Sequence, residues 1–303
     1  MKGRARMDRR DFLKTTLVAG AGALAADELP ALELRHPEEF VGILVDTTRC
    51  IGCRSCEVAC GETHDLLVPE VLSDGALAAP RTTSERQYTV VNRFETEQGE
   101  VFVKRQCMHC HQAACASACP TEAMHKTLKG PVIWDGDKCI GCRFCMVSCP
   151  FDMPKFEFNE WNPRLVKCTM CFERQAEGRK PACVEACPTD ALMFGVQVDN
   201  LEIARHRIYA HPDKYVHQIY GEHEAGGTGW LYLSAVPFDQ IGFRTDLGRT
   251  PFPEYTREFL YAVPAILFGV PAFLLALNTL ADKGEPASAG ELEFRPERDG
   301  GER

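Results

Sequence analysis

The chain has 303 residues, of which 45% are hydrophobic and 25% charged, as is typical of a globular protein. Its formal net charge is −9, and because residues 1–26 hold six basic and two acidic side chains, the remainder would carry −13. An acidic chain is poorly suited to bind nucleic acid, so we predict no nucleic-acid partner.

The first twenty-six residues have the features of an export signal. Arg9 and Arg10 are followed by Phe-Leu-Lys, and residues 15–26 are small, apolar and uncharged. That apolar stretch is too short to span a membrane, and Ala23–Ala25 resembles a cleavage site. A basic amphipathic helix is the alternative, but the stretch has no charged face. Adjacent arginines favour the twin-arginine route, so we predict a twin-arginine signal at 1–26.

All sixteen cysteines fall into four quartets of similar spacing. In each quartet, two residues separate the first two cysteines and three residues separate the last two. The members are Cys50, Cys53, Cys56 and Cys60; Cys107, Cys110, Cys115 and Cys119; Cys139, Cys142, Cys145 and Cys149; and Cys168, Cys171, Cys183 and Cys187. Four thiolates complete one cubane, so the chain has ligands for four 4Fe-4S clusters.

This spacing has a physical reason. Thiolates two residues apart let one loop hold several irons of a cubane. The cysteine three residues later lies on the following helix and, in bacterial-type ferredoxins, binds the other cluster of a pair. Proline then ends that short helix. The first quartet differs because Gly61 follows Cys60, and we expect a different helix exit there with the site retained.

Three other uses of cysteine fit the spacing less well. Zinc ribbons have two C-x2-C pairs far apart, and only the quartet at 168–187, with its eleven-residue gap, resembles one. Disulfides between near neighbours close small loops and stabilise little. A thioredoxin-like motif needs a single C-x2-C pair. Zinc at 168–187 stays open as an alternative, while the pattern as a whole indicates iron–sulfur clusters.

Short strand-like runs alternate with the quartets, which is the rhythm of ferredoxin-like units. The predicted fold class is α+β, with two bacterial-ferredoxin-like units at 40–200, each holding two 4Fe-4S clusters, then a C-terminal extension and one transmembrane helix. The predicted elements are strands at 40–46, 88–95, 100–105, 132–135 and 192–198, a hairpin turn at 96–99, and a helix at 199–207 capped by Asp199 and Glu202.

Several histidines and basic residues lie near the quartets. We expect none of the histidines to be a ligand, and two of them, His64 and His125, to be solvated. The basic side chains could raise cluster potentials, but we expect them to be solvated. The other residues concerned are His109, His111, Lys104, Arg105, Lys138 and Arg143.

The chain after the last quartet has no cluster ligand. Residues 201–256 contain a turn at Gly226–Gly227 and a strand-like run at 230–236, and we expect either a docking extension or a packing role. Residues 259–280 carry no charge and, at about 1.5 Å per residue, reach roughly 33 Å. A buried core helix is the alternative, but no polar stripe is visible. We predict a transmembrane helix there and a disordered tail at 281–303.

The full pattern resembles the four-cluster ferredoxin-like subunits of respiratory membrane enzymes, which include formate dehydrogenase N, dimethyl sulfoxide reductase and hydrogenase-2. The most similar branch is the HybA-type subunit of hydrogenase-2. That branch likewise combines a twin-arginine signal, four quartets, a segment like YGEHEAGGTGWLYLSAVP (220–237) and one C-terminal anchor. The formate dehydrogenase branch shares the anchor and a Gly-Gly-Thr segment. The likeness covers nearly the whole chain.

The resemblance implies which cysteines share a cluster. Quartets one and four would form one ferredoxin unit, and quartets two and three the other. Cluster 1 would take Cys50, Cys53, Cys56 and Cys187; cluster 2, Cys60, Cys168, Cys171 and Cys183; cluster 3, Cys107, Cys110, Cys115 and Cys149; and cluster 4, Cys119, Cys139, Cys142 and Cys145. No ligand is missing, so we expect four cubanes and no three-iron cluster.

The resemblance also implies a role. The chain would be a non-catalytic subunit that relays electrons from the large and small subunits of a periplasm-facing nickel–iron hydrogenase to a quinone-reactive integral membrane subunit. It would be exported folded, with its clusters already built, and anchored on the outer face of the cytoplasmic membrane. The alternative is the same relay in a molybdenum or tungsten oxidoreductase such as a formate dehydrogenase. A freestanding enzyme is disfavoured, because no quartet is incomplete in the manner of an open catalytic metal site.

Overall fold

The computed structural model describes residues 40–68, 74–158 and 163–281. The predicted export signal, with Arg9 and Arg10, lies outside these residues, as does the predicted tail apart from Ala281. The strands are β1 (Val41–Asp46), β2 (Val90–Thr96), β3 (Gly99–Arg105), β4 (Met124–Lys126), β5 (Val132–Trp134), β6 (Lys155–Phe156), β7 (Leu165–Val166), β8 (Leu192–Val196) and β9 (Trp230–Leu233). The α-helices are α2 (Ser55–Thr63), α3 (Ala114–Ser117), α4 (Phe144–Val147), α5 (Phe172–Ala176), α6 (Ala182–Glu185), α7 (Gln197–Ala210) and α8 (Glu254–Ala281).

A three-stranded sheet in the order β8-β1-β9 lies at the centre of the fold. β1 pairs antiparallel with β8 and parallel with β9, so that Ile43 lies between Phe194 and Trp230. The sequence of β1 is apolar almost throughout, as expected for a strand that is covered on both faces. β1 leads into the first quartet and β8 follows the fourth, so the sheet joins the two ends of the cluster region.

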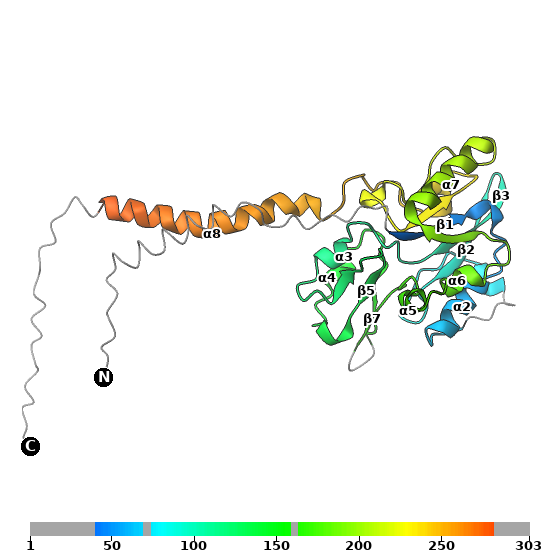
Figure 1. Cartoon of the computed structure of the whole chain (residues 1–303), viewed down its shortest axis with the longest axis horizontal. Coiled ribbons are helices and arrows are strands. Elements are labelled where there is room, and N and C mark those ends of the chain that lie inside the picture. Colours follow the sequence, from blue (N-terminus) through cyan, green and yellow to red (C-terminus); the bar gives the residue numbers. More distant parts are fainter. Residues whose placement is uncertain (1–39, 69–73, 159–162, 282–303) are drawn as a thin grey trace, which may run out of the picture.

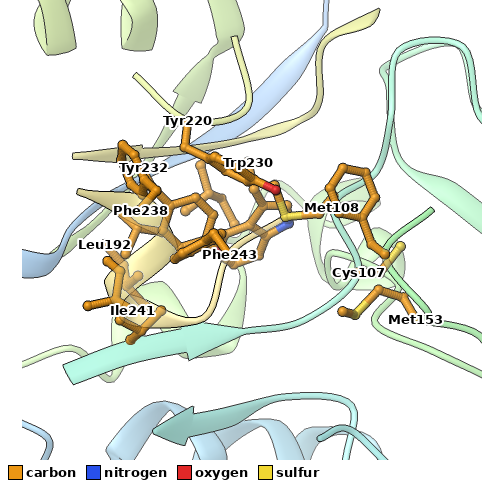
Figure 2. Packing of buried hydrophobic residues seen from close by; sticks show 14 of the residues in the cluster. Cys107, Met108, Met153, Leu192, Tyr220, Trp230, Tyr232, Phe238, Ile241 and Phe243 are labelled. Atoms are coloured by element: carbon orange, nitrogen blue, oxygen red, sulfur yellow. The ribbon is translucent and has the colours of Figure 1, made fainter. Parts of the chain in front are cut away.

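Aromatic side chains from the part of the chain after residue 200 fill the main core (Figure 2). Ring centroids are 4.5 Å apart for Tyr220 and Phe243, and 4.8 Å apart for Tyr232 and Phe243. Figure 2 shows Cys107, of the second quartet, at the edge of the same cluster. Every residue of β9 is buried. This strand therefore has the packing role that was one of the two expectations for this part of the chain.

Trp230 is fully buried at the centre of this packing. Its replacement by alanine is expected to cost about 3–5 kcal/mol, the usual range for a buried Phe or Trp. Thermal unfolding followed by circular dichroism should then begin at a lower temperature. The matched control is Tyr209→Ala on α7, because that side chain is 88% exposed and little change is expected there. Equal stability of the two variants would contradict the role of Trp230 in the core.

The remaining strands form three two-stranded antiparallel hairpins. β2 and β3 pair from Val90 with Arg105 to Thr96 with Gly99, which confirms the predicted hairpin and its turn. Gly99 has φ 107°, a conformation that glycine adopts at little cost. β4 pairs with β5, and β6 with β7. β4, β6 and β7 are two or three residues long and lie where the sequence pattern predicts no strand.

The helix after the last quartet begins earlier than predicted. α7 starts at Gln197 with Val196 as its N-cap, so Asp199 lies inside the first turn and does not cap the helix. Tertiary contacts determine this boundary, because the buried side chain of Gln197 donates a hydrogen bond to the carbonyl oxygen of Thr228 at 2.6 Å. A buried amide left without a partner would cost about 1–3 kcal/mol, which is at least as much as a helix cap contributes.

α8 is a single long helix that extends away from the other elements (Figure 1). Glu254–Thr279 is long and apolar enough to cross a membrane, with a mean hydropathy of 2.2, and it alone has these properties among the described residues. The helix starts before the predicted boundary at 259 and contains Pro264 and Pro271, which membrane helices tolerate. Its described side chains after Glu254 are exposed, which argues against the core-helix alternative.

Candidate iron–sulfur sites

The loops of the first and third quartets follow the same backbone course. Gly52 and Gly141 have φ angles of 70° and 69°, and Arg54 and Arg143, which precede α2 and α4, have φ angles of 61° and 62°. A Cβ atom at Gly52 would lie 2.5 Å from the ring of Phe102, so only glycine fits there. Each loop therefore coils tightly before its helix, as a loop that wraps a cluster requires.

The second and fourth quartets also repeat one another. The third cysteine of each, Cys115 or Cys183, lies on a four-residue helix, α3 or α6. After Cys-Pro, the chain turns through left-handed conformations at Glu122 and Asp190, with φ angles of 55° and 51°. The chain thus contains two copies of a coiled loop and two copies of a helix-and-turn segment.

The structure brings cysteines that are distant in sequence to common cavities. One cavity is lined by the four cysteines expected for cluster 1, which are Cys50, Cys53, Cys56 and Cys187. Another is lined by the four expected for cluster 4, which are Cys119, Cys139, Cys142 and Cys145. Each cavity therefore combines quartets in the way that the resemblance implies.

The other two sets lie closer to the interior. Burial raises the pKa of Cys60 well above its usual value, and the charges of the other expected ligands of cluster 2 raise it further; these are Cys168, Cys183 and Cys171. The pKa of Cys110 is raised in the same way by burial and by the other expected ligands of cluster 3, which are Cys149, Cys107 and Cys115. Electrostatic interaction weakens with distance, so the thiols of each set lie in one region of the fold; an effect of the same kind also joins Cys168 to Cys107 of the other unit.

The buried thiols fit a positively charged iron–sulfur core. Burial is the main reason why the pKa values of Cys115 and Cys168 rise to about 12 and those of Cys145, Cys149 and Cys171 to about 11. A thiol must lose its proton to bind metal, and bound metal stabilises the thiolate. Across the described ranges, no three His, Cys, Asp or Glu side chains are close enough to hold a single metal ion.

His64 lies beside a cysteine, whereas the sequence led us to expect a solvated side chain. Its Nε2 atom is 3.5 Å from Sγ of Cys171, and its ring packs against Tyr88 with centroids 5.3 Å apart. Burial lowers the pKa of His64, which favours the neutral ring. This position could have been inferred from the sequence, because His64 follows Cys60 by four residues. It lies at the C-terminal end of α2 and so stays close to the cluster region.

Lys104 is buried, so the expectation of a solvated side chain was wrong. Only 3% of the residue is exposed, and Nζ donates hydrogen bonds to Oγ1 of Thr89 at 2.7 Å and to Oε1 of Gln106 at 3.0 Å. Burial opposes the charge, but negative cysteines outweigh this effect and raise the pKa of Lys104; the cysteines are Cys183, Cys56 and Cys168. Lys104 also lines the cavity expected to hold cluster 1.

Of the other histidines and basic residues near the quartets, some are buried and some lie on the surface. His109 is buried, and its Nδ1 atom accepts a hydrogen bond from the backbone N–H of Val132 at 2.9 Å. Burial lowers the pKa of His111 to about 4. Lys138 is on the surface and pairs with Asp135 at 3.3 Å, as expected for a solvated charge. Neither His109 nor His111 lines the two cysteine cavities.

Comparison with known families agrees with this arrangement. Residues 49–123 and 99–197 each match the family model of a 4Fe-4S dicluster domain. Two dicluster domains take four 4Fe-4S clusters, for which the sixteen cysteines suffice. Residues 6–26 match the TAT (twin-arginine translocation) pathway signal sequence, so the chain is exported, with α8 as a candidate membrane anchor.

Related proteins match along most of the chain. A protein of Nitratidesulfovibrio vulgaris (strain Hildenborough) is 44% identical over 297 residues, covering 94% of this chain and 80% of the relative. Hydrogenase-2 operon protein HybA of Escherichia coli O157:H7 is 36% identical over 330 residues, covering 94% of this chain and 99% of the relative. The nitrate-inducible formate dehydrogenase iron-sulfur subunit of Escherichia coli (strain K12) is 35% identical over 211 residues, covering 67% of this chain and 71% of the relative. The chain therefore belongs to the family of iron–sulfur electron-transfer subunits that includes HybA.

Proposed function

We propose that this electron-transfer subunit works between a nickel–iron hydrogenase on the outer face of the membrane and a quinone-reactive membrane subunit. The observation that carries the hydrogenase assignment is the match to HybA of hydrogenase-2 over nearly the full length of both chains. The export signal and the apolar helix α8 support a position at the outer face. The subunit makes and breaks no substrate bonds, because that chemistry belongs to the large and small subunits of its partner.

In this proposal, each cluster takes three cysteines from one quartet and one from another, in the four sets that the resemblance implies. The two cavities, each lined by four thiols from two quartets, support the sets for clusters 1 and 4. The mutual electrostatic effects of the buried thiols support the sets for clusters 2 and 3. Bound clusters accept and release single electrons, and the chain's residues hold them, bury them and set the charge around them.

The same pairing divides the cluster region into two bacterial-ferredoxin-like units, one from quartets one and four and one from quartets two and three. The repeated φ angles at the two coiled loops support this division. The proposed boundaries are an export signal at 1–26, the cluster domain at 40–200, an extension at 201–256 that packs through β9 and docks a partner with its exposed side, a membrane helix at 259–280 and a disordered tail at 281–303.

The positions of two residues suggest the direction of the relay. Cys107, of cluster 3, is among the groups whose charge raises the pKa of Cys168, of cluster 2, so the two units are near each other at these clusters. Gln112, which lies within the second quartet, donates a hydrogen bond to Glu254 at the start of α8, at 3.3 Å. The unit of quartets two and three therefore faces the membrane partner, and the unit of quartets one and four faces the hydrogenase.

A second candidate function changes the catalytic partner and keeps the relay. The observation that favours it is the 35% identity to a formate dehydrogenase iron–sulfur subunit over 211 residues. In that case a molybdenum or tungsten oxidoreductase would supply the electrons. The match covers less of this chain than the match to HybA does, 67% against 94%, so we place it second.

Electron paramagnetic resonance distinguishes the two partners. Anaerobic membranes that contain the native complex are exposed separately to hydrogen and to formate, and membranes lacking this chain serve to assign its coupled cubane signals. We expect hydrogen alone to reduce these signals. Reduction by formate alone would contradict the hydrogenase assignment and support the second candidate.

A further inference from the structure

A buried cation lies beside the cysteines of the first ferredoxin unit, and unlike the equally buried Arg54, which pairs with Glu57, it is held by neutral groups. Lys104, on β3, lines the cavity formed by the cysteines of cluster 1. Its charge also acts on thiols of the cluster 2 set, namely Cys60, Cys168 and Cys171. The same ammonium group therefore acts on cysteines of both sets.

The groups that hold Lys104 are all neutral. Nζ donates to the hydroxyl of Thr89 and to the side-chain carbonyl of Gln106, and it lies over the ring of Trp230, 4.7 Å from the centroid. Gln106 is positioned in turn by a hydrogen bond from its Nε2 atom to the hydroxyl of Tyr232 at 2.6 Å. This neutral cradle keeps the charge in place without cancelling it.

Carboxylates near this site have other partners. Glu57, which lies between Cys56 and Cys60 in the sequence, is bound by Arg54 and Arg81. Among the residues that the structure describes, Lys104 forms no ion pair with a carboxylate. The negative charge that balances this buried lysine must therefore come from the cluster sites themselves.

We propose that Lys104 is a shared tuning residue that raises the midpoint potentials of clusters 1 and 2 together. This inference rests on the proposed assignment of cysteines to these two clusters. A cluster gains one negative charge when it is reduced, and a fixed positive charge nearby stabilises that reduced form. Because Lys104 is buried, solvent and salt screen its field only weakly. Raising both potentials together keeps the two clusters close in energy, which favours electron transfer between them.

The test is a redox titration of the purified complex followed by electron paramagnetic resonance. Lys104→Met removes the charge and keeps the apolar stem. We expect the potentials of clusters 1 and 2 to shift to more negative values, with those of clusters 3 and 4 unchanged. The matched control is Lys138→Met, since Lys138 precedes Cys139 but is 57% exposed and paired with Asp135, and no shift is expected there. Unchanged potentials of clusters 1 and 2 in Lys104→Met would overturn the proposal.

A second variant decides the matter if Lys104→Met fails to assemble its clusters. Gln106→Glu places a carboxylate on the ammonium group with almost no change in shape, so it should lower the same two potentials. Unchanged potentials in this variant would also overturn the proposal. Iron content and the effect of Cys53→Ser test the cluster assignment separately. Suppose that the wild-type complex holds four clusters and that Cys53→Ser removes a signal whose potential Lys104→Met does not shift. The assignment of cysteines to cluster 1 would then be wrong, and not only the tuning role of Lys104.

Discussion

Quinone reduction by the complex should fall to near zero when Cys53 is replaced by serine. Cys53 is one of the four cysteines that line the cavity proposed for cluster 1, and it is exposed. A serine oxygen is a poorer ligand for iron than a thiolate, so this cluster should be lost or weakened. Without it, electrons lack an intermediate site between the catalytic partner and the next cluster. Hydrogen oxidation with an artificial dye should remain unchanged, because the dye accepts electrons before they reach this chain.

Measurements of both activities, together with iron content, check this prediction. Cys187→Ser provides the matched comparison for the proposed wiring, since Cys187 belongs to the fourth quartet and lines the same cavity. Both variants should lose the same paramagnetic signal. Cys183→Ser, from the same quartet as Cys187, should affect a different one. Quinone reduction at the normal rate in Cys53→Ser would show that the clusters do not act as a linear series.

Removal of α8 should release the protein from the membrane. A chain that ends after Pro253 lacks the segment with a mean hydropathy of 2.2, and it should move from the membrane fraction to the soluble fraction when produced without partner subunits. The remaining fold should be retained, because the described side chains of α8 after Glu254 are exposed and the sheet and the cysteine cavities are built from other residues. Fractionation, with iron content as the check on folding, measures both effects.

The control for this truncation is the double variant Pro264→Ala and Pro271→Ala. Alanine keeps the segment apolar and helical, so membrane association should be unchanged. A truncated chain that stayed in the membrane fraction under the same conditions would show that α8 is not the anchor. A truncated chain that lost its clusters would show instead that the helix contributes to folding.

Much of this protein could be predicted from local patterns in the sequence. Cysteine spacing indicated iron–sulfur chemistry, because ligand spacing is a local property of a loop and its following helix. The hairpin at β2 and β3 was predicted from alternating residues around a turn, and β1 and β5 from short apolar runs. The twin-arginine signal and the apolar helix are likewise patterns of neighbouring residues, and both agree with the family match and with the extent of α8.

Other features depend on contacts between distant residues. The start of α7 follows from the contact of Gln197 with Thr228, which no local capping rule contains. β9 lies beside β1 although nearly 190 residues separate Ile43 from its partner Trp230, and this pairing places the segment after residue 200 in the core. Sequence periodicity can indicate that a strand is buried, but it does not identify the neighbouring strand.

The sequence by itself determined the chemistry of this protein: sixteen thiols in four quartets, an export signal and an apolar helix. Only the tertiary structure decided the environment of those thiols. It placed Lys104 in the interior and His64 beside Cys171, although each had been expected to be solvated. The physical reason is that ligand identity depends on residue type and spacing, whereas burial and the local electric field depend on which distant segments pack around the site.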